Sequence, residues 1–306
     1  MARELWWAFA AVAVACFWLA MAAVLAARRP LEPAELAAWA SGHGLEGVAD
    51  RRLEPAARYL GRSRLCRTVG GAVPFVAGTV APALWAATRG LPAPWPLGLF
   101  GTRSWLAGYL AGVLVAEYRW ARPRTGVVRS AALVPRRLGD YLPARVVAGM
   151  RLAALATVAL VPLLAWGPLA APVPVRGLVV GGRGGALATA ALAVAVAVAV
   201  ELAARRLVGR PQPAADPEAL AVDDALRSTS VHAVAGAGLA IVLLSLSVQV
   251  GLVAANLGGG PGRTAVVALS WACAAAALAA WIRVGHPRRW AVRRVLARDA
   301  GGPGRA

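Results

Sequence analysis

Long apolar segments alternate with shorter polar segments along the whole chain. Seven of the apolar segments approach or exceed the ~20 residues that a helix needs to cross the hydrocarbon core of a membrane. Within that core, only helices or closed barrels satisfy all main-chain polar groups. The pattern therefore predicts an all-α fold, a polytopic transmembrane helix bundle of about seven spans. The predicted spans are 5–27, 69–87, 99–116, 152–171, 186–204, 231–255 and 265–284.

The distribution of arginine predicts the orientation of this bundle. All 33 residues in the Lys+Arg count are Arg, and 27 of them lie in four segments, 28–69, 117–151, 201–230 and 283–306. Basic residues concentrate in the cytoplasmic loops of membrane proteins. The distribution thus predicts the N-terminus outside and the C-terminus inside. An alternative with six spans would place both termini on the same side.

The first and last of the cytoplasmic segments have helical patterns of their own. Segment 28–68 contains EPAELAAWA and DRRLEPAARYLGRSRLC, separated by SGHG, which predicts two short helices at the membrane interface. Segment 285–306 contains PRRWAVRRVLARD, which predicts another interfacial helix, anchored by Arg and Trp. We interpret 28–68 and 285–306 as cytoplasmic interfacial segments of a single integral membrane domain.

The composition agrees with a membrane protein and bears on its partners. Hydrophobic residues make up 59% of the chain and the mean hydropathy is +0.61, whereas soluble domains contain roughly 45–50% apolar residues. The net charge is +19, but the Arg are interleaved with the apolar segments and do not form one basic stripe. This distribution argues against nucleic-acid binding and favours anionic membrane lipids as partners of the positive charge.

The sixth predicted span carries the most polar side chains. Ser245, Gln249 and Asn256 are spaced by four and seven residues, so they fall on one face of a helix together with Gly238. One interpretation is packing, with hydrogen bonds between helices and a close approach at the glycine. The other is a polar lining for a substrate path, because polar groups inside a membrane are often functional.

A second candidate site precedes this span and contains Asp223, Asp224, Arg227 and His232. Paired aspartates can hold magnesium for pyrophosphate chemistry, but that chemistry needs further acids one helical turn away. Arg227 occupies that position, so we expect either aspartate to cap a short helix or to pair with Arg205, Arg206 or Arg227 near the interface. His232 is interpreted as a capping or interfacial histidine, with a pH-sensing or phosphate-binding role as the alternative.

The remaining chemistry-bearing residues are dispersed. The three His and three Cys lack the spacing of metal ligands, so no metal and no cofactor is expected. The motifs of metalloproteases, serine hydrolases and phosphate-binding loops are missing from the sequence, so no catalytic residue is assigned. Gly108 and Gly112 form a GxxxG seam in the third predicted span, which suits close packing within the bundle or a homo-oligomer.

Two cytoplasmic loops read YRWARPRTGVVRSAALVPRRLGDYLP and RPQPAADPEALAVDDALRSTSVHAVAGAG. With the spans around them, roughly residues 109–250, they resemble a group of uncharacterised multi-pass integral membrane proteins of high-GC actinobacteria. The resemblance implies a protein of the bacterial plasma membrane and assigns no catalytic residue.

These features predict a multi-pass plasma-membrane protein without catalytic activity that forms part of a larger assembly. Its basic cytoplasmic loops would be the docking surface for a cytoplasmic partner such as an ATPase. The first alternative is a transporter or the permease subunit of an ATP-driven exporter, with Ser245, Gln249 and Asn256 lining the path. The second alternative is a membrane enzyme that acts on lipid.

Overall fold

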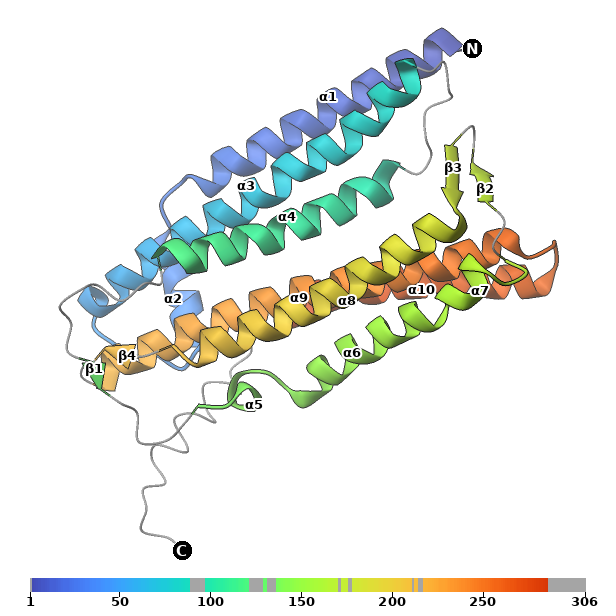
Figure 1. The fold of residues 1–306 in the computed structure, drawn as a ribbon. Helices are drawn as coiled ribbons and strands as arrows, with labels where there is room; N and C mark the ends of the chain where they lie inside the picture. The colour runs from blue at the N-terminus through green and yellow to red at the C-terminus, as the bar shows by residue number, and fades with distance from the viewer. Residues whose placement is uncertain are drawn as a thin grey trace, which may run out of the picture.

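The computed structural model describes residues 2–88, 97–120, 129–130, 136–169, 172–175, 178–210, 212–213 and 217–285. These residues form a helical bundle, as predicted, with two short antiparallel ladders (Figure 1). The helices are α1 (Ala2–Ala27), α2 (Pro33–Gly42), α3 (Asp50–Thr88), α4 (Leu97–Trp120), α5 (Leu138–Tyr141), α6 (Ala144–Ala159), α7 (Val161–Ala165), α8 (Gly182–Val208), α9 (Pro217–Asn256) and α10 (Pro261–Val284). The ladders pair β1 (Arg129–Ser130) with β4 (Gln212–Pro213), and β2 (Pro172–Val175) with β3 (Leu178–Gly181).

Four helical stretches are long and apolar enough to cross a membrane. They are Ala144–Ala165, Gly182–Val208, Glu218–Asn256 and Pro261–Val284. They overlap the predicted spans 152–171, 186–204, 231–255 and 265–284, and the first of them starts and ends earlier than predicted. The helical bundle with apolar, membrane-compatible helices is therefore confirmed.

The three other predicted spans also lie on helices. Spans 5–27, 69–87 and 99–116 fall on α1, α3 and α4, respectively. Part of each span has side chains outside the described residues, and within α1 the described apolar stretch is Val14–Ala27. The count of seven spans and the orientation of the termini stay predictions.

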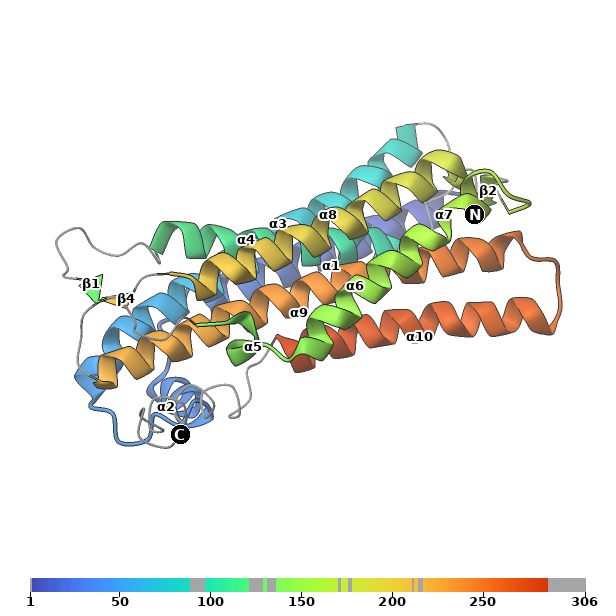
Figure 2. The ribbon, with the colours of Figure 1, turned by 60° about the horizontal axis from the view of Figure 1, so that its bottom comes forward.

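Helix α9 lies at the centre of the bundle. It packs against α3, α4, α6, α8 and α10, whereas α1 packs against α3 at one edge and α10 runs along α9 at another (Figures 1 and 2). Every residue of α9 from 231 to 242 is buried. The central helix is thus enclosed by its neighbours on all sides along this stretch, which agrees with its long run of Val, Ala, Leu and Ile.

Small residues set the distances between the helices. A side chain at Gly236 would place its Cβ 2.5 Å from the nitrogen of Gly285, and one at Gly238 would overlap Val200 of α8. Side chains at Gly108 and Gly112 of α4 would overlap the main chain of Gly70 and Cys66 in α3, respectively. The GxxxG seam is therefore filled by α3 of the same chain, in the packing that small residues allow between membrane helices.

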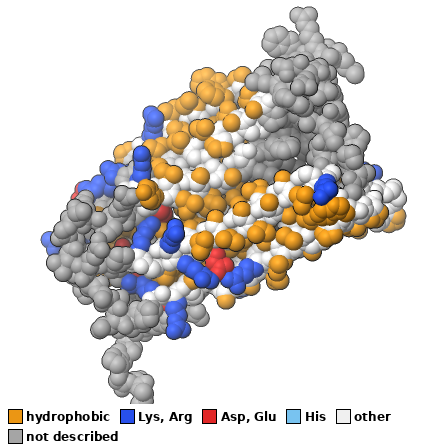
Figure 3. All heavy atoms as spheres, viewed as in Figure 1, with side chains coloured by type: hydrophobic (Ala, Val, Ile, Leu, Met, Phe, Trp, Pro, Cys, Tyr) orange, Lys and Arg blue, Asp and Glu red, His pale blue; other side chains and the backbone are white. Residues whose placement is uncertain are grey.

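The outward faces of the helices are apolar. Trp18, Leu152, Val198 and Trp271 are among the large side chains that are exposed, and apolar side chains cover much of the visible surface in Figure 3. On the same face, most basic side chains gather toward the end where α3 and α9 begin (Figure 3). Exposed apolar surface of this extent is unusual in soluble proteins and is compatible with contact to lipid chains.

One prediction for the segment 28–68 is wrong. Its second helical pattern does not form a short helix of its own but is the first half of α3, which runs unbroken for 39 residues. The reason is burial at helical spacing: Leu53 and Ala56 of α3 pack with Val222 and Ala225 of α9 and with Leu45, which follows α2. Helix α2, this half of α3 and the first turns of α9 lie together (Figure 1), and their side chains form a small apolar core separate from the main one. The predicted interfacial helix within 285–306 lies outside the described residues.

Replacement of Gly112 by Val should destabilise the bundle. The new side chain would overlap the main chain of Cys66 and Arg67 and push α3 and α4 apart, at a cost of roughly 1–3 kcal/mol for an overpacked contact. The midpoint of thermal unfolding of the detergent-purified protein would measure this effect. Gly149→Ala is the matched control, because a methyl group there meets nothing within 4 Å. Equal midpoints for Gly112→Val and the wild type would contradict the α3–α4 seam.

Candidate functional site

The first third of α9 carries a series of polar side chains that each contact a different part of the fold, and we call it the α9 polar cluster. Its members are Asp223, Asp224, Arg227, Thr229, Ser230 and His232. Four of them are almost fully buried: Asp224, Arg227, Ser230 and His232 are at most 7% exposed. Buried polar and charged groups are costly unless they are paired. Their partners therefore determine how the surrounding elements pack on α9.

Asp224 binds the short helix α5 and Arg136, two residues before it. Its Oδ1 accepts a hydrogen bond of 2.9 Å from the Tyr141 hydroxyl, and its Oδ2 pairs with Nη2 of Arg136 at 3.0 Å. Burial of the hydroxyl, together with the negative charge of Asp224, raises the pKa of Tyr141 well above its ordinary value. Tyr141 therefore remains a hydrogen-bond donor to the carboxylate throughout the physiological pH range.

Arg227 closes the carboxyl-terminal end of α8. Its Nη1 donates to the carbonyl oxygens of Val208 and Arg210 at 2.7 and 2.9 Å, and its Nη2 donates to Asp223 at 2.8 Å. The last carbonyls of a helix lack partners within that helix, so a basic side chain there supplies the missing donors. Asp223 thus pairs with Arg227, which is one of the pairings predicted from the sequence. Asp224 pairs with Arg136 instead, and both aspartates lie inside α9 rather than at the start of a helix.

Glu117, at the end of α4, is a buried acid that was not among the predicted site residues. Its carboxylate accepts hydrogen bonds from the hydroxyls of Tyr59 in α3 and Ser230 in α9. Nη1 of Arg210 lies 2.7 Å from its other oxygen. This group connects α3, α4, α9 and the residues after α8. The signal in the sequence was only an acid at the end of a predicted span, which on its own resembles an ordinary span boundary.

His232 joins the ends of two helices to α9. Its Nε2 lies 2.9 Å from the carbonyl oxygen of Tyr141 at the end of α5, and its Nδ1 lies 2.9 Å from that of Val284 at the end of α10. A neutral imidazole has one N–H group, whereas the imidazolium has a donor on each nitrogen. His232 thus connects α9 to the ends of α5 and α10, and it lies where the polar part of α9 meets the apolar part.

The polar side of α2 reaches the cluster at Thr229. Nε1 of Trp39 donates to the Thr229 hydroxyl oxygen at 3.1 Å, and Nε2 of His43 lies 3.3 Å from the same oxygen. Nδ1 of His43 lies 2.7 Å from the carbonyl oxygen of Trp39. Burial lowers the pKa of His43 below its ordinary value, and the nearby His232 acts in the same direction. The fold thus favours a neutral His43 between α2 and α9.

The three polar residues of the sixth predicted span lie on the apolar part of α9 and bond to main-chain oxygens. Ser245 and Asn256 donate to Ile241 and Leu252 of their own helix at 2.9 Å. Gln249 donates to the carbonyl oxygen of Ala186 in α8, also at 2.9 Å. Only Gln249 among the three connects two helices, and the three side chains do not bond to one another.

The apolar parts of α9 and α10 are joined by a pair of serines that the sequence did not single out. Ser247 and Ser270 each donate to the other's carbonyl oxygen at 2.8 Å. A serine within an apolar run gives no sign of its partner in the sequence.

Within the described parts of the chain, no group of three or more His, Cys, Asp or Glu is placed to hold a metal ion. The contacts of the α9 polar cluster thus bring together the first half of α3 and the ends of α4, α5, α8 and α10.

Glu117→Ala should destabilise the protein by roughly 3 kcal/mol, because it leaves two hydroxyls and one guanidinium without their buried partner. Glu201→Ala is the matched control. Glu201 also pairs with two arginines, Arg151 and Arg205, but these are more than half exposed, so its loss should cost less than about 1 kcal/mol. Thermal unfolding in detergent compares the two variants. Similar losses for both would contradict a special role for the buried carboxylate.

The docking of α2 on α9 should weaken in acid. Because the folded state lowers the pKa of His43, the unfolded state binds more protons, and stability falls as the pH drops below the ordinary histidine value of about 6.5. Hydrogen exchange of residues 33–48, corrected for the intrinsic rate, should therefore speed up between about pH 7.5 and pH 5.5. His43→Asn keeps a donor for the Trp39 carbonyl but does not titrate, so the acid effect should disappear. The same acceleration in His43→Asn would rule His43 out as its cause.

Comparisons with protein families, curated proteins and solved structures return no match. The resemblance of the two loops to actinobacterial multi-pass membrane proteins therefore stays a prediction. The contacts of the described residues are what supports a function for this chain.

Proposed function

We propose that this protein is a non-catalytic, multi-pass component of a larger assembly in the bacterial plasma membrane. In this proposal the chain crosses the membrane seven times, with the N-terminus outside and the C-terminus inside. The end formed by α2 and the first halves of α3 and α9 is then cytoplasmic. It docks a cytoplasmic protein such as an ATPase.

The observation that carries the proposal is the length of α3 and α9. With 39 and 40 residues, each is about 60 Å long at 1.5 Å per residue, twice the ~30 Å of a hydrocarbon core. Helix α10 is shorter, and it ends where Val284 meets His232 and Gly285 meets Gly236. If α10 ends at the membrane interface, roughly 28 Å of α9 extends beyond it.

This extension has the internal contacts of a rigid structure. Leu53 and Ala56 of α3 share a core with Val222 and Ala225 of α9, and Trp39 fixes α2 to Thr229. Buried charges in ion pairs and hydrogen bonds hold the same region to the ends of α4, α5 and α8. A rigid extension loses little conformational entropy when a partner binds, which favours docking.

The surface of the extension indicates the chemistry of its partner. Arg51, Arg58 and Arg62 are exposed and spaced by seven and four residues, so they form a stripe on one face of α3, in which Arg58 also pairs with Glu54. Because α3 continues without a break from its predicted span, the stripe extends away from the membrane and not along it. Such a stripe favours a protein with an acidic surface, since complementary charge speeds association.

The alternative functions have less support. A substrate path along α9 would need polar groups that face it, but Ser245, Gln249 and Asn256 direct their donors to main-chain oxygens. A lipid-acting enzyme would need acids that converge on a phosphate, but Asp223 and Asp224 each pair with an arginine. The packing interpretation of the first group and the structural interpretation of the second agree better with these contacts.

The double variant Arg51→Glu/Arg62→Glu should lose its cytoplasmic partner. Native membranes would be crosslinked, the protein purified, and every co-purifying protein identified with its ratio to the chain. Reversal of two stripe charges should lower the amount of bound partner by roughly tenfold or more, which corresponds to a loss of about 1.4 kcal/mol. Recovery of the wild-type chain alone, or only with copies of itself, would contradict the docking proposal.

A matched double variant tests whether the stripe itself is responsible. Arg145 and Arg206 are also exposed, at the start of α6 and near the end of α8. Arg145→Glu/Arg206→Glu changes the net charge equally, and it should retain the partner. Equal loss from both double variants would show that total charge, and not the α3 stripe, governs binding.

A further inference from the structure

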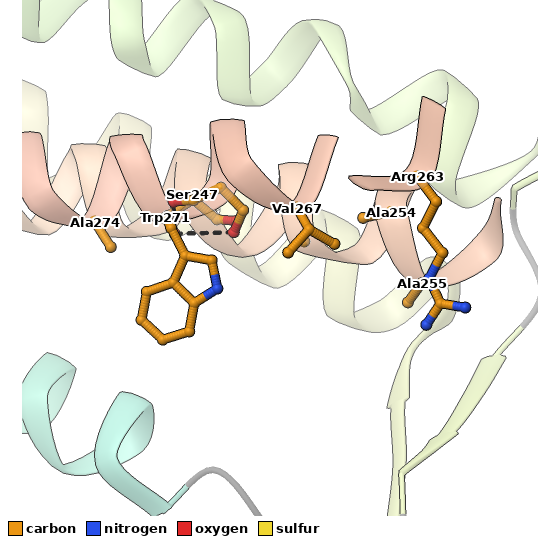
Figure 4. Close-up of a pocket in the computed structure, with 9 residues that line it drawn as sticks. Ser247, Ala254, Ala255, Arg263, Val267, Trp271 and Ala274 are labelled. Atoms are coloured by element: carbon orange, nitrogen blue, oxygen red, sulfur yellow. Dashed lines mark hydrogen bonds between the residues drawn. The ribbon is translucent and has the colours of Figure 1, made fainter. Parts of the chain in front are cut away.

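The far half of α9 forms a groove with α10 that the proposed docking function does not use. Its volume is about 240 Å³, which is room for more than a single water molecule. The small residues Gly251 and Ala274 line the groove, and Val267 and Trp271 project beside it (Figure 4). Trp271 is 70% exposed. The groove therefore opens on the apolar outer surface of the bundle.

One end of this groove is basic. Arg263, in the first turn of α10, lines the groove, and its guanidinium reaches over Ala255 (Figure 4). Arg263 forms no ion pair with any residue whose side chain the structure describes. The nearby hydroxyls of Ser247 and Ser270 already donate to each other's main chains. The groove thus has one positive charge without an ion-pair partner among the described side chains, and the rest of its lining is apolar or already hydrogen-bonded.

The dimensions of the groove match one leaflet of a membrane. From Arg263 to Ala274, α10 rises about 16 Å, which is close to half of the ~30 Å hydrocarbon thickness. A phosphate at Arg263 would lie at the level of the headgroups, and an acyl chain could follow the groove toward Ala274. A helix from a second copy would cover Arg263 and leave its charge buried without a partner, which is costly.

We propose that this groove binds one anionic phospholipid of the leaflet in which Arg263 lies. Arg263 pairs with the lipid phosphate, and the acyl chain lies between Gly251 of α9 and the side chains of Val267 and Trp271 in α10. The site is separate from the proposed docking end, because it lies at the opposite end of α9.

Native mass spectrometry of the full chain would test this site. The delipidated protein in detergent would be mixed with phosphatidylglycerol or with phosphatidylcholine of the same acyl chains. We expect one tightly held phosphatidylglycerol per chain, with a preference over phosphatidylcholine of about fivefold, the contribution of one arginine near an anionic headgroup. Arg263→Gln should abolish this preference. Gly251→Leu should lower the occupancy of both lipids by filling the groove.

A control variant and a soluble probe complete the test. Arg183 is an exposed residue at the start of α8 that stacks on Trp166 and lies outside the groove. Arg183→Gln should therefore leave the lipid preference unchanged. Glycerol phosphate, which has the phosphate but no acyl chain, should not compete at equal concentration. The proposal is overturned by unchanged lipid binding in Arg263→Gln, by an equal loss in Arg183→Gln, or by full competition from glycerol phosphate. A dimer that Gly251→Leu dissociates would overturn it in favour of a second copy.

Discussion

The fold depends on the cost of burying charge along the first third of α9. Asp224 and Arg227 are removed from water there, and Glu117 is buried beside them. A buried charge without its partner is strongly destabilising. Each of these groups is therefore held by two or more specific neighbours, and most of those neighbours belong to other elements. Apolar packing alone tolerates small shifts between helices, so we attribute the relative positions of the helix ends to these polar contacts.

The two parts of α9 solve the packing problem in different ways. Up to His232, its polar side chains contact groups on α3, α4, α5 and α10 and at the end of α8. Beyond His232, glycine and alanine bring the neighbouring helices close, and the few polar groups bond to main-chain oxygens. This division follows the division of the sequence into a polar and an apolar part. It agrees with a helix that leaves the membrane, because lipid chains offer no hydrogen bonds and membrane helices pack through small residues.

The sequence predicted the helices better than their contacts. Length and apolar content were enough for the spans on α8, α9 and α10, because these signals are local. The length of α3 was missed because Leu53 and Ala56 lie between arginines, so their helical spacing was hidden in a segment of polar average composition. The site was predicted in part: Asp224 was identified, but Arg136 and Tyr141 lie more than 80 residues away in the chain. No local pattern encodes a pairing at that separation.

The bundle contains two groups of helices that meet at α9. Helices α1, α3 and α4 pack together, and α6, α8 and α10 pack on or around α9 (Figure 1). Beside their apolar packing, the groups are connected by Glu117 at one level and by the aromatic contact of Trp105 with Trp281, 4.7 Å between ring centroids, at another. Connections separated along the helix axes resist rotation as well as sliding. Movement of one group against the other would have to break the buried contacts of Glu117, which supports the proposal of a rigid component over one that alternates between two states.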